Sequence, residues 1–140
     1  MTQPPKWFRI VAILALLWNL LGCAAYLVDA MMTPEDVAQL SAAQQELYAS
    51  RPSWAVGATA VAVWLGALGS LGLILRKRWA TIVLVLSLLG VIAQDYWLFV
   101  ASGAARLAGP TAAILQAIVL LVAIALVALS LRASKRGWLA

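Results

Sequence analysis

The sequence predicts an all-α membrane protein whose four transmembrane helices form a single domain over residues 1–140. Of the 140 residues, 65% are hydrophobic and 11% are charged, whereas ordinary soluble domains average about 45–50% and about 25%. Four apolar stretches, at about 7–30, 53–75, 79–100 and 110–131, exceed the roughly 18 residues that indicate a membrane-spanning helix. They are continuous rather than alternating, which favours helices over the strands of a barrel.

The charged residues predict the orientation of these spans. Because cytoplasmic loops carry an excess of Lys and Arg, the side with more basic residues is expected to face the cytoplasm. Eight basic residues flank the span ends on one side: Lys6, Arg9, Arg76, Lys77, Arg78, Arg132, Lys135 and Arg136. The other side carries Arg51, Arg106, Asp29, Glu35, Asp36 and Glu46. The sequence therefore predicts that both termini are cytoplasmic, an arrangement called N-in/C-in.

This distribution also explains the net charge of +5. The basic residues cluster at span ends, where they contact anionic lipid, and they are not interleaved with exposed aromatic residues as in a nucleic-acid-binding face. The lipid bilayer, including its anionic lipids, is thus a predicted partner, and nucleic acid is not.

The first span contains the one cysteine of the chain. Leu20-Leu21-Gly22-Cys23 imitates the end of a lipoprotein signal, after which the cysteine carries lipid. Leu21 is bulky for such a site, and the apolar stretch continues beyond Cys23. We therefore expect a buried, unmodified Cys23, with lipid modification as the alternative.

Tryptophan residues are predicted to anchor the span ends at the membrane interfaces. An indole at this depth buries its ring while its N–H reaches the headgroups. The C-terminal segment, in which basic residues alternate with Trp138, is predicted to be a further surface anchor. The four span-end anchors are Trp7 and Trp79 at the cytoplasmic side and Trp54 and Trp97 at or near the external side.

A short amphipathic helix is predicted at about 34–50, between the first two spans. Thr33-Pro34-Glu35-Asp36 supplies a hydroxyl cap, a proline for the first helical position and acidic residues for the first turn. Pro52 ends the helix, because the residue before a proline disfavours helical geometry. Val37, Leu40, Leu47 and Tyr48 recur at spacings that suit one face. This external helix is either an interfacial linker or a lid or docking surface.

The second span carries a row of small residues, which is typical of helix contacts in membranes. Gly66, Gly69 and Gly72 continue a row that begins at Thr59 and Ala62, at spacings of three and four. This face is predicted to pack on another helix. Residues 76–78 then turn the chain directly into the third span, and residues 101–109 form a small connection before the fourth.

Polar side chains inside the spans are the candidate functional residues, because they are costly in lipid and normally face the bundle or water. The cluster consists of Asn19, Gln94, Asp95 and Gln116, and Tyr26 and Tyr96 are expected to add hydroxyls, with Arg106 within reach of Asp95. One interpretation is structural, with the amides joining helices by hydrogen bonds. The other is a small-solute or proton-linked site that opens outward.

Residue content excludes several kinds of chemistry. The chain has no histidine and a single cysteine. It therefore lacks the residues for a histidine-ligated haem, a histidine-containing zinc site, a histidine base or an intrachain disulfide. We expect no metal, no cofactor and no catalytic residues, and we predict that the protein is not an enzyme.

The whole chain resembles a group of short bacterial inner-membrane proteins. The resemblance lies in Trp18-Asn19 with Gly22, Met32-Thr33-Pro34-Glu35, the stretch from Tyr48 to Pro52 and Trp54, Arg76-Lys77-Arg78-Trp79-Ala80, and Arg136-Gly137-Trp138-Leu139. Members of this group are often labelled "sugar transporter". The resemblance implies a bacterial cytoplasmic membrane location, and it carries over no functional residues.

Two functions follow from these observations. The first is a small membrane protein without catalytic activity that serves as an accessory or assembly component of a larger membrane complex. The alternative is a transporter of a small, sugar-like solute through a polar pocket in the outer half of the membrane. Because four helices leave little room for alternating access, such a transporter is expected to work as an oligomer.

Overall fold

The computed structural model of the chain describes residues 3–101 and 105–140, with side chains described except at positions 47, 101, 105–109, 111 and 112. The described residues form helices and no strands. In chain order the elements are α1 (Lys6–Ala30), α2 (Pro34–Ala38), α3 (Ala42–Ser50), α4 (Ser53–Ile74), α5 (Trp79–Tyr96), a π-helical turn (Trp97–Ala101) and α6 (Ala105–Lys135). Four of the helices are long and apolar enough to cross a membrane, so this part of the prediction is confirmed.

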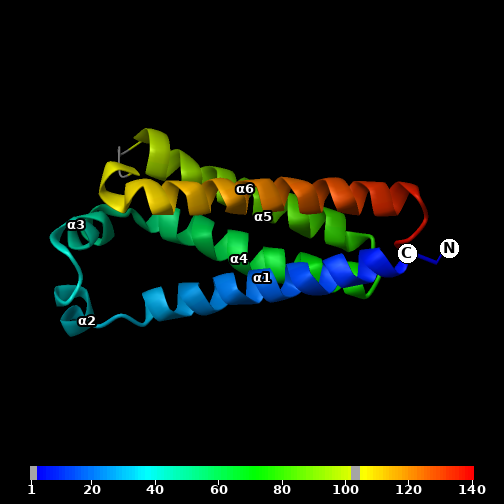
Figure 1. Cartoon of the computed structure of the whole chain (residues 1–140), viewed down its shortest axis with the longest axis horizontal. Helices are drawn as coiled ribbons and strands as arrows, with labels where there is room; N and C mark the ends of the chain where they lie inside the picture. Colours follow the sequence, from blue (N-terminus) through cyan, green and yellow to red (C-terminus); the bar gives the residue numbers. More distant parts are fainter. Residues whose placement is uncertain (1–2, 102–104) are drawn as a thin grey trace.

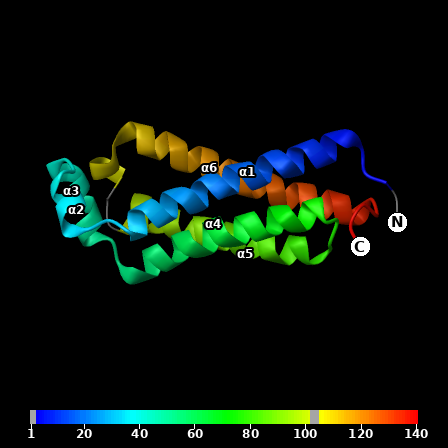
Figure 2. The ribbon, with the colours of Figure 1, turned by 90° about the horizontal axis from the view of Figure 1, so that it is seen from below.

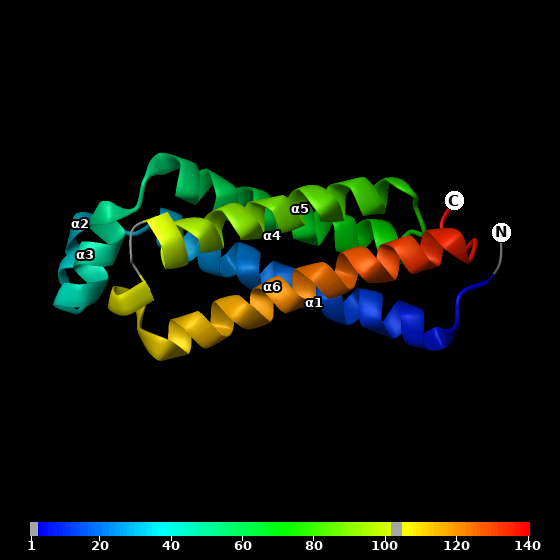
Figure 3. The same cartoon turned by 90° about the horizontal axis from the view of Figure 1, so that it is seen from above.

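The four long helices form an elongated bundle around a central pair (Figure 1). α4 packs along α5, α1 packs on α4, and α6 packs mainly on α5. Figures 2 and 3 show that α1 and α6 run at an angle to each other, and Figure 1 shows that they lie apart. The two outer helices are therefore held by different members of the central pair.

The two ends of the bundle differ. Both chain termini lie at one end, called the terminal end below, together with the turn between α4 and α5 (Figure 1). α2 and α3 lie at the opposite end, called the α3 end. Between the ends, large apolar side chains such as Leu21, Ile82 and Leu121 are exposed on the outside of the bundle. This is the surface that a bilayer core would cover.

Small residues bring α4 and α5 close together. A Cβ atom added at Gly90 would lie 2.7 Å from the carbonyl oxygen of Ala58 and 2.9 Å from the backbone nitrogen of Ala62. A Cβ atom added at Gly69 would lie 2.6 Å from side-chain atoms of Leu84, and one added at Gly72 would lie 2.8 Å from the Cβ of Ala80. The row of Gly66, Gly69 and Gly72 therefore lies on the α4 face that packs on α5. Gly66 also borders α1, because its added Cβ would overlap the amide oxygen of Asn19.

The segment at about 34–50 forms two short helices where the sequence predicts one. Each helix begins with its own capping box, in which a hydroxyl and a side chain three residues later satisfy each other's backbone N–H. Thr33 Oγ1 accepts a bond from the Asp36 N–H at 3.2 Å, and Ser41 Oγ accepts one from the Gln44 N–H at 3.2 Å. Because α2 ends at Ala38 and the second capping box begins a separate helix, α3, the residues Val37, Leu40 and Tyr48 do not share one continuous helical face.

The last long helix begins earlier than the sequence predicts. Residues 101–109 were expected to be a connection, yet α6 starts at Ala105 and contains Pro110. Ala, Arg and Leu at positions 105–108 favour a helix, and a proline near the start of a helix removes one backbone hydrogen bond. The predicted start at Pro110 was therefore wrong by about one turn.

The terminal end is closed by packed side chains. Phe8, Leu73, Trp138 and Leu139 belong to one buried cluster, and the rings of Trp7 and Trp138 meet edge to face with centroids 5.7 Å apart. A turn at Gly137, whose φ of 75° suits glycine, folds the chain back. Trp138 is thus buried in the bundle, and the prediction that it is a surface anchor was wrong.

The close approach of α4 and α5 gives a stability prediction. We expect Gly90→Ala to lower the free energy of unfolding by about 1–3 kcal/mol, because the added methyl would press on α4 backbone atoms. The measurement is reversible unfolding of the purified protein in mild detergent, followed by circular dichroism.

Gly57→Ala is the matched control on α4, since a Cβ added there meets no atom within 4 Å. We expect no loss of stability in this variant, because alanine favours a helix more than glycine does. Equal stability of the two variants would contradict the close packing at Gly90.

Candidate functional site

A cavity of about 550 Å³ lies inside the α3 end of the bundle. Its lining comes from α1, α3, α4, α5, the π-helical turn and α6, so it forms where the long helices meet the segment of α2 and α3. Ligand pockets commonly measure about 300–1,000 Å³. This cavity, called the polar cavity below, is therefore large enough to hold a small molecule.

An ion pair joins two walls of the polar cavity. Asp29 lies in the last turn of α1. Arg51 lies between α3 and Pro52, and its backbone is extended. Arg51 Nη2 is 2.6 Å from Asp29 Oδ2, and the guanidinium lies 5.1 Å from the centre of the Tyr48 ring. The pair ties the end of α1 to the start of α4, and it leaves this wall without net charge.

A chain of hydrogen bonds forms the opposite wall. Gln94 Nε2 donates to Gln116 Oε1 at 2.6 Å, which links α5 to α6. Gln94 Oε1 accepts from the Thr59 hydroxyl at 2.7 Å, which links α5 to α4. The Thr59 oxygen is also 3.1 Å from the carbonyl oxygen of Ala55. Side-chain hydrogen bonds of this kind join transmembrane helices and contribute about 0.6 kcal/mol each on average.

The structure brings together two of the four predicted cluster residues. Gln94 and Gln116 are hydrogen-bonded in the polar cavity, whereas Asn19 lies deeper in the bundle. There Asn19 Nδ2 donates to the carbonyl oxygen of Ala15 at 2.8 Å and lies 3.3 Å from the Ser70 hydroxyl. Asn19 therefore joins α1 to α4 away from the other two amides.

Asp95 is separate from the polar cavity. It is next to Gln94 on α5 but points in another direction, because successive helical residues differ by about 100°. Its side chain is 9% exposed, and among the described residues nothing donates a hydrogen bond to its Oδ1. The Arg106 side chain, which was expected to reach Asp95, lies outside the described residues.

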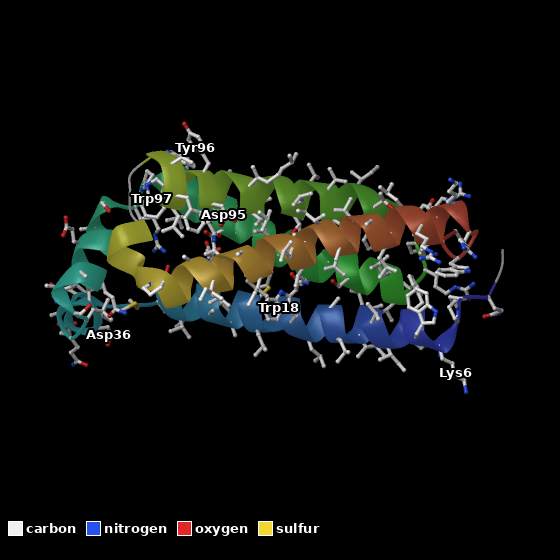
Figure 4. All side chains as sticks on the ribbon, turned by 45° about the horizontal axis from the view of Figure 1, so that its top comes forward. Lys6, Trp18, Asp36, Asp95, Tyr96 and Trp97 are labelled. Atoms are coloured by element: carbon white, nitrogen blue, oxygen red, sulfur yellow. The ribbon has the colours of Figure 1, made fainter. Side chains whose placement is uncertain are left out.

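The two candidate hydroxyls have different positions. Tyr26 lines the polar cavity and meets the Trp64 ring edge to face at 6.5 Å. Tyr96 is exposed, and Figure 4 shows its side chain pointing away from the bundle. Tyr26 can therefore contribute to the site, and Tyr96 cannot.

A second cavity of about 270 Å³ continues toward the middle of the bundle. It lies between α1 and α6, with α4 and α5 behind it, and its lining is almost entirely apolar. We call it the apolar cavity. The two cavities adjoin, because five residues line both of them: Gly22, Ala25, Ala62, Val63 and Val119.

One of the four predicted interface anchors lies inside the protein. Trp7, Trp54 and Trp79 are partly exposed, but Trp97 is 6% exposed and lines the polar cavity. Trp97 lies three residues after Gln94 and therefore on the same α5 face, toward α4. The prediction that Trp97 is an interface anchor was wrong for this reason.

Cys23 is buried in α1, where its thiol lies 3.4 Å from the carbonyl oxygen of Val63 on α4. This position is close to the junction of the two cavities. In the structure the thiol serves as a small packing group between α1 and α4.

The polar cavity is suited to hydrogen bonding. Amides and hydroxyls line it, and its two charged side chains, Asp29 and Arg51, neutralise each other. Gln116 Nε2 donates no hydrogen bond among the described residues, which leaves a donor for a ligand. Within the described part of the chain, no three His, Cys, Asp or Glu side chains form a group that could hold a metal ion.

Sequence reasoning missed three residues of this site. Asp29 and Arg51 were counted as external charges, although opposite charges at the adjoining ends of two antiparallel helices are a signal for pairing. Thr59 was assigned to the helix-packing row. Its position on the same face as Ala62 and Gly66 indicated a contact, but its hydrogen-bonding partner on α5 could not be identified from spacing.

Comparison with known proteins gives no relative for this arrangement. No family model matches the chain, and neither does any curated protein or solved structure. Function must therefore be argued from the geometry of the two cavities.

The hydrogen bond between Gln94 and Gln116 predicts a measurable coupling between their contributions to stability. In a double-mutant cycle of Gln94→Leu and Gln116→Leu, we expect the effects on the free energy of unfolding to be non-additive by about 0.6 kcal/mol, and at most about 1.7 kcal/mol. The measurement is unfolding in detergent of the wild type, both single variants and the double variant.

The matched cycle pairs Gln116→Leu with Asn19→Leu. Asn19 bonds to Ala15 and Ser70 and shares no partner with Gln116, so these two effects should add. Additive effects in the Gln94 and Gln116 cycle would show that the two amides do not interact.

Proposed function

We propose that the chain is a multi-pass protein of the bacterial cytoplasmic membrane, with both termini in the cytoplasm and α2 and α3 outside. The charges support this orientation. All eight basic residues outside the α3 end flank helix termini at the terminal end. The α3 end carries Glu35, Asp36 and Glu46 together with the Asp29–Arg51 pair. Figure 4 shows Lys6 and Asp36 at these opposite ends.

The function that the geometry supports best is non-catalytic binding of a small molecule with an uncharged polar group in the polar cavity. The observation that carries this proposal is the hydrogen-bonded wall of Thr59, Gln94 and Gln116 facing a cavity of about 550 Å³. A few convergent polar groups in a mainly apolar pocket are typical of ligand sites. In this proposal the protein is an accessory component of a membrane complex and responds to its ligand.

A transporter of a sugar-like solute is the second candidate, and the polar cavity also favours it. A solute that left the polar cavity toward the cytoplasm would first meet the apolar cavity and then the buried cluster around Phe8, Leu73 and Trp138. Passage would therefore require this cluster to separate, within an oligomer large enough for alternating access. The accessory role needs no such movement, and we prefer it for that reason.

The proposed orientation predicts the outcome of thiol labelling. In a Cys23→Ala background, Gln39→Cys should react with a membrane-impermeant maleimide added to intact spheroplasts, because Gln39 is exposed in the turn between α2 and α3.

Lys77→Cys, in the turn at the terminal end, should react only after the membrane is permeabilised. Labelling of Lys77→Cys but not Gln39→Cys in intact spheroplasts would invert the proposed orientation.

The proposed ligand site predicts a thermal shift that depends on Gln116. The purified protein is heated with a panel of monosaccharides, polyols and alkyl glycosides. A panel member that binds should raise the Tm, because ligand at about 100 times its Kd stabilises the folded state by about 2.7 kcal/mol. Gln116→Leu should abolish the shift, because it removes the amide that faces the cavity.

Tyr96→Phe is the control, since this hydroxyl points away from the bundle and its loss should leave the shift unchanged. If no panel member shifts the Tm of the wild type, the binding function is wrong. Size-exclusion chromatography with light scattering on the same samples separates the two candidates. A larger homo-oligomer favours the transporter, whereas a stable complex with other membrane proteins favours the accessory component.

A further inference from the structure

The two adjoining cavities have opposite chemical character. The polar cavity contains the amide wall and the Asp29–Arg51 pair. The adjoining apolar cavity extends from the shared lining residues toward the centre of the bundle, at Ser87, Val122 and Leu126. A molecule that filled both would need a polar group at one end and an apolar portion at the other.

The apolar cavity has few polar groups, and the Asn19 amide nitrogen and the Ser87 hydroxyl already donate hydrogen bonds within the protein. Asn19 donates to Ala15 and lies near the Ser70 hydroxyl, and the Ser87 hydroxyl donates to the carbonyl oxygen of Ala62 at 2.6 Å. A polar solute placed here would lose hydrogen bonds to water and find few in return. The apolar cavity therefore favours an alkyl chain over a sugar or an ion.

The size of the apolar cavity excludes a partner helix as its occupant. A transmembrane helix is about 10–12 Å wide with its side chains and about 30 Å long across the membrane. A cylinder of these dimensions has a volume on the order of 2,000 Å³, whereas the apolar cavity measures about 270 Å³. A single short chain fits this volume, and a helix does not.

The charge of the polar cavity indicates an uncharged head group. Its acidic and basic side chains are paired at 2.6 Å, so this wall has no net charge with which to attract a phosphate or an ammonium group. Arg51 Nε is buried without a partner among the described residues, and it adds a donor for a hydroxyl. The remaining polar lining consists of amides and hydroxyls, including Gln116 Nε2 as an open donor. These groups match the hydroxyls of a sugar or glycerol head.

Access from the bilayer is compatible with the helix arrangement. The apolar cavity lies between α1 and α6, which pack on different members of the central pair (Figure 1). We infer that the two cavities together bind one uncharged, single-chain amphiphile, with its hydroxyl-rich head at the amide wall and its alkyl chain between α1 and α6. This inference rests on the proposed function and names the class of ligand.

The probe for this inference is octyl-β-glucoside that carries a diazirine at the end of its alkyl chain. The full-length protein is placed in phosphatidylcholine nanodiscs, incubated with the probe below its micellar concentration and irradiated. Labelled peptides are then identified by mass spectrometry. We expect saturable labelling of residues that line the apolar cavity about 10 Å from the amide wall, such as Ser87, Val122 and Ala123, and at least tenfold lower labelling when unlabelled octyl-β-glucoside is in excess.

Two alanine residues in α1 provide a matched pair of variants. Ala25 lines both cavities, and its neighbour Ala24 is exposed but lines neither. Ala25→Phe should fill the junction and abolish the saturable labelling, whereas Ala24→Phe should leave it unchanged. An unchanged Tm in both variants verifies that they fold. Equal labelling of the two variants would overturn the inference, since the chain would then not pass the junction.

Competition distinguishes failure of this inference from failure of the proposed function. If methyl-β-glucoside, which lacks the chain, competes as well as octyl-β-glucoside, the polar cavity binds its ligand but the amphiphile inference is wrong. If octanol competes equally well, the sugar head is not recognised and the inference is also wrong. If no compound competes and none shifts the Tm, both the inference and the proposed function are wrong.

Discussion

The close approach of α4 and α5 is the contact on which the rest of the bundle depends. Between helices in lipid there is no hydrophobic driving force, so association relies on packing at short range and on hydrogen bonds. Gly90 allows the α4 backbone to approach α5 directly, and Gly69 and Gly72 accept side chains from α5 in the same interface. In the structure α1 packs mainly on the α4 side of this pair and α6 mainly on its α5 side. The space between α1 and α6 is a consequence of that division.

Different interactions hold the helices together at the two ends of this space. At the terminal end, Phe8 and Trp138 pack with Leu73 and Leu139 and close the bundle. At the α3 end, Arg51 and Asp29 hold the segment of α2 and α3 against α1, while Thr59, Gln94 and Gln116 connect α4, α5 and α6. The polar groups thus stabilise the same end at which they create a place for a ligand. Structural and binding roles of the amides are compatible, because Gln116 joins α5 through its oxygen and keeps its nitrogen available.

The sequence was sufficient to predict features that depend on local composition. Span lengths follow from the bilayer thickness, and the glycine row follows from its spacing of three and four. Other features depend on contacts between residues far apart in the chain. The partners Thr59 and Gln94 are 35 positions apart, and Asp29 and Arg51 are 22 positions apart, so their pairing requires the relative rotation of the helices. The prediction for Trp97 was wrong for the same reason, because the depth of a residue in the membrane does not show which side of α5 faces α4. The break before α3 was visible in principle, because Ser41 and Gln44 repeat the pattern of Thr33 and Asp36.

The polar cavity reaches into the bundle from the α3 end and stops before the terminal end, and we expect water to enter it. This expectation can be tested by thiol accessibility in a Cys23→Ala background. Thr59 lies six residues into α4, about 9 Å along the helix, in the wall of the polar cavity, whereas Ser70 is fully buried nearer the terminal end. A small water-soluble methanethiosulfonate reagent added from the external side should modify Thr59→Cys and leave Ser70→Cys unmodified. An unreactive Thr59→Cys in a protein that retains its Tm would show that the cavity is closed to water and contradict this account.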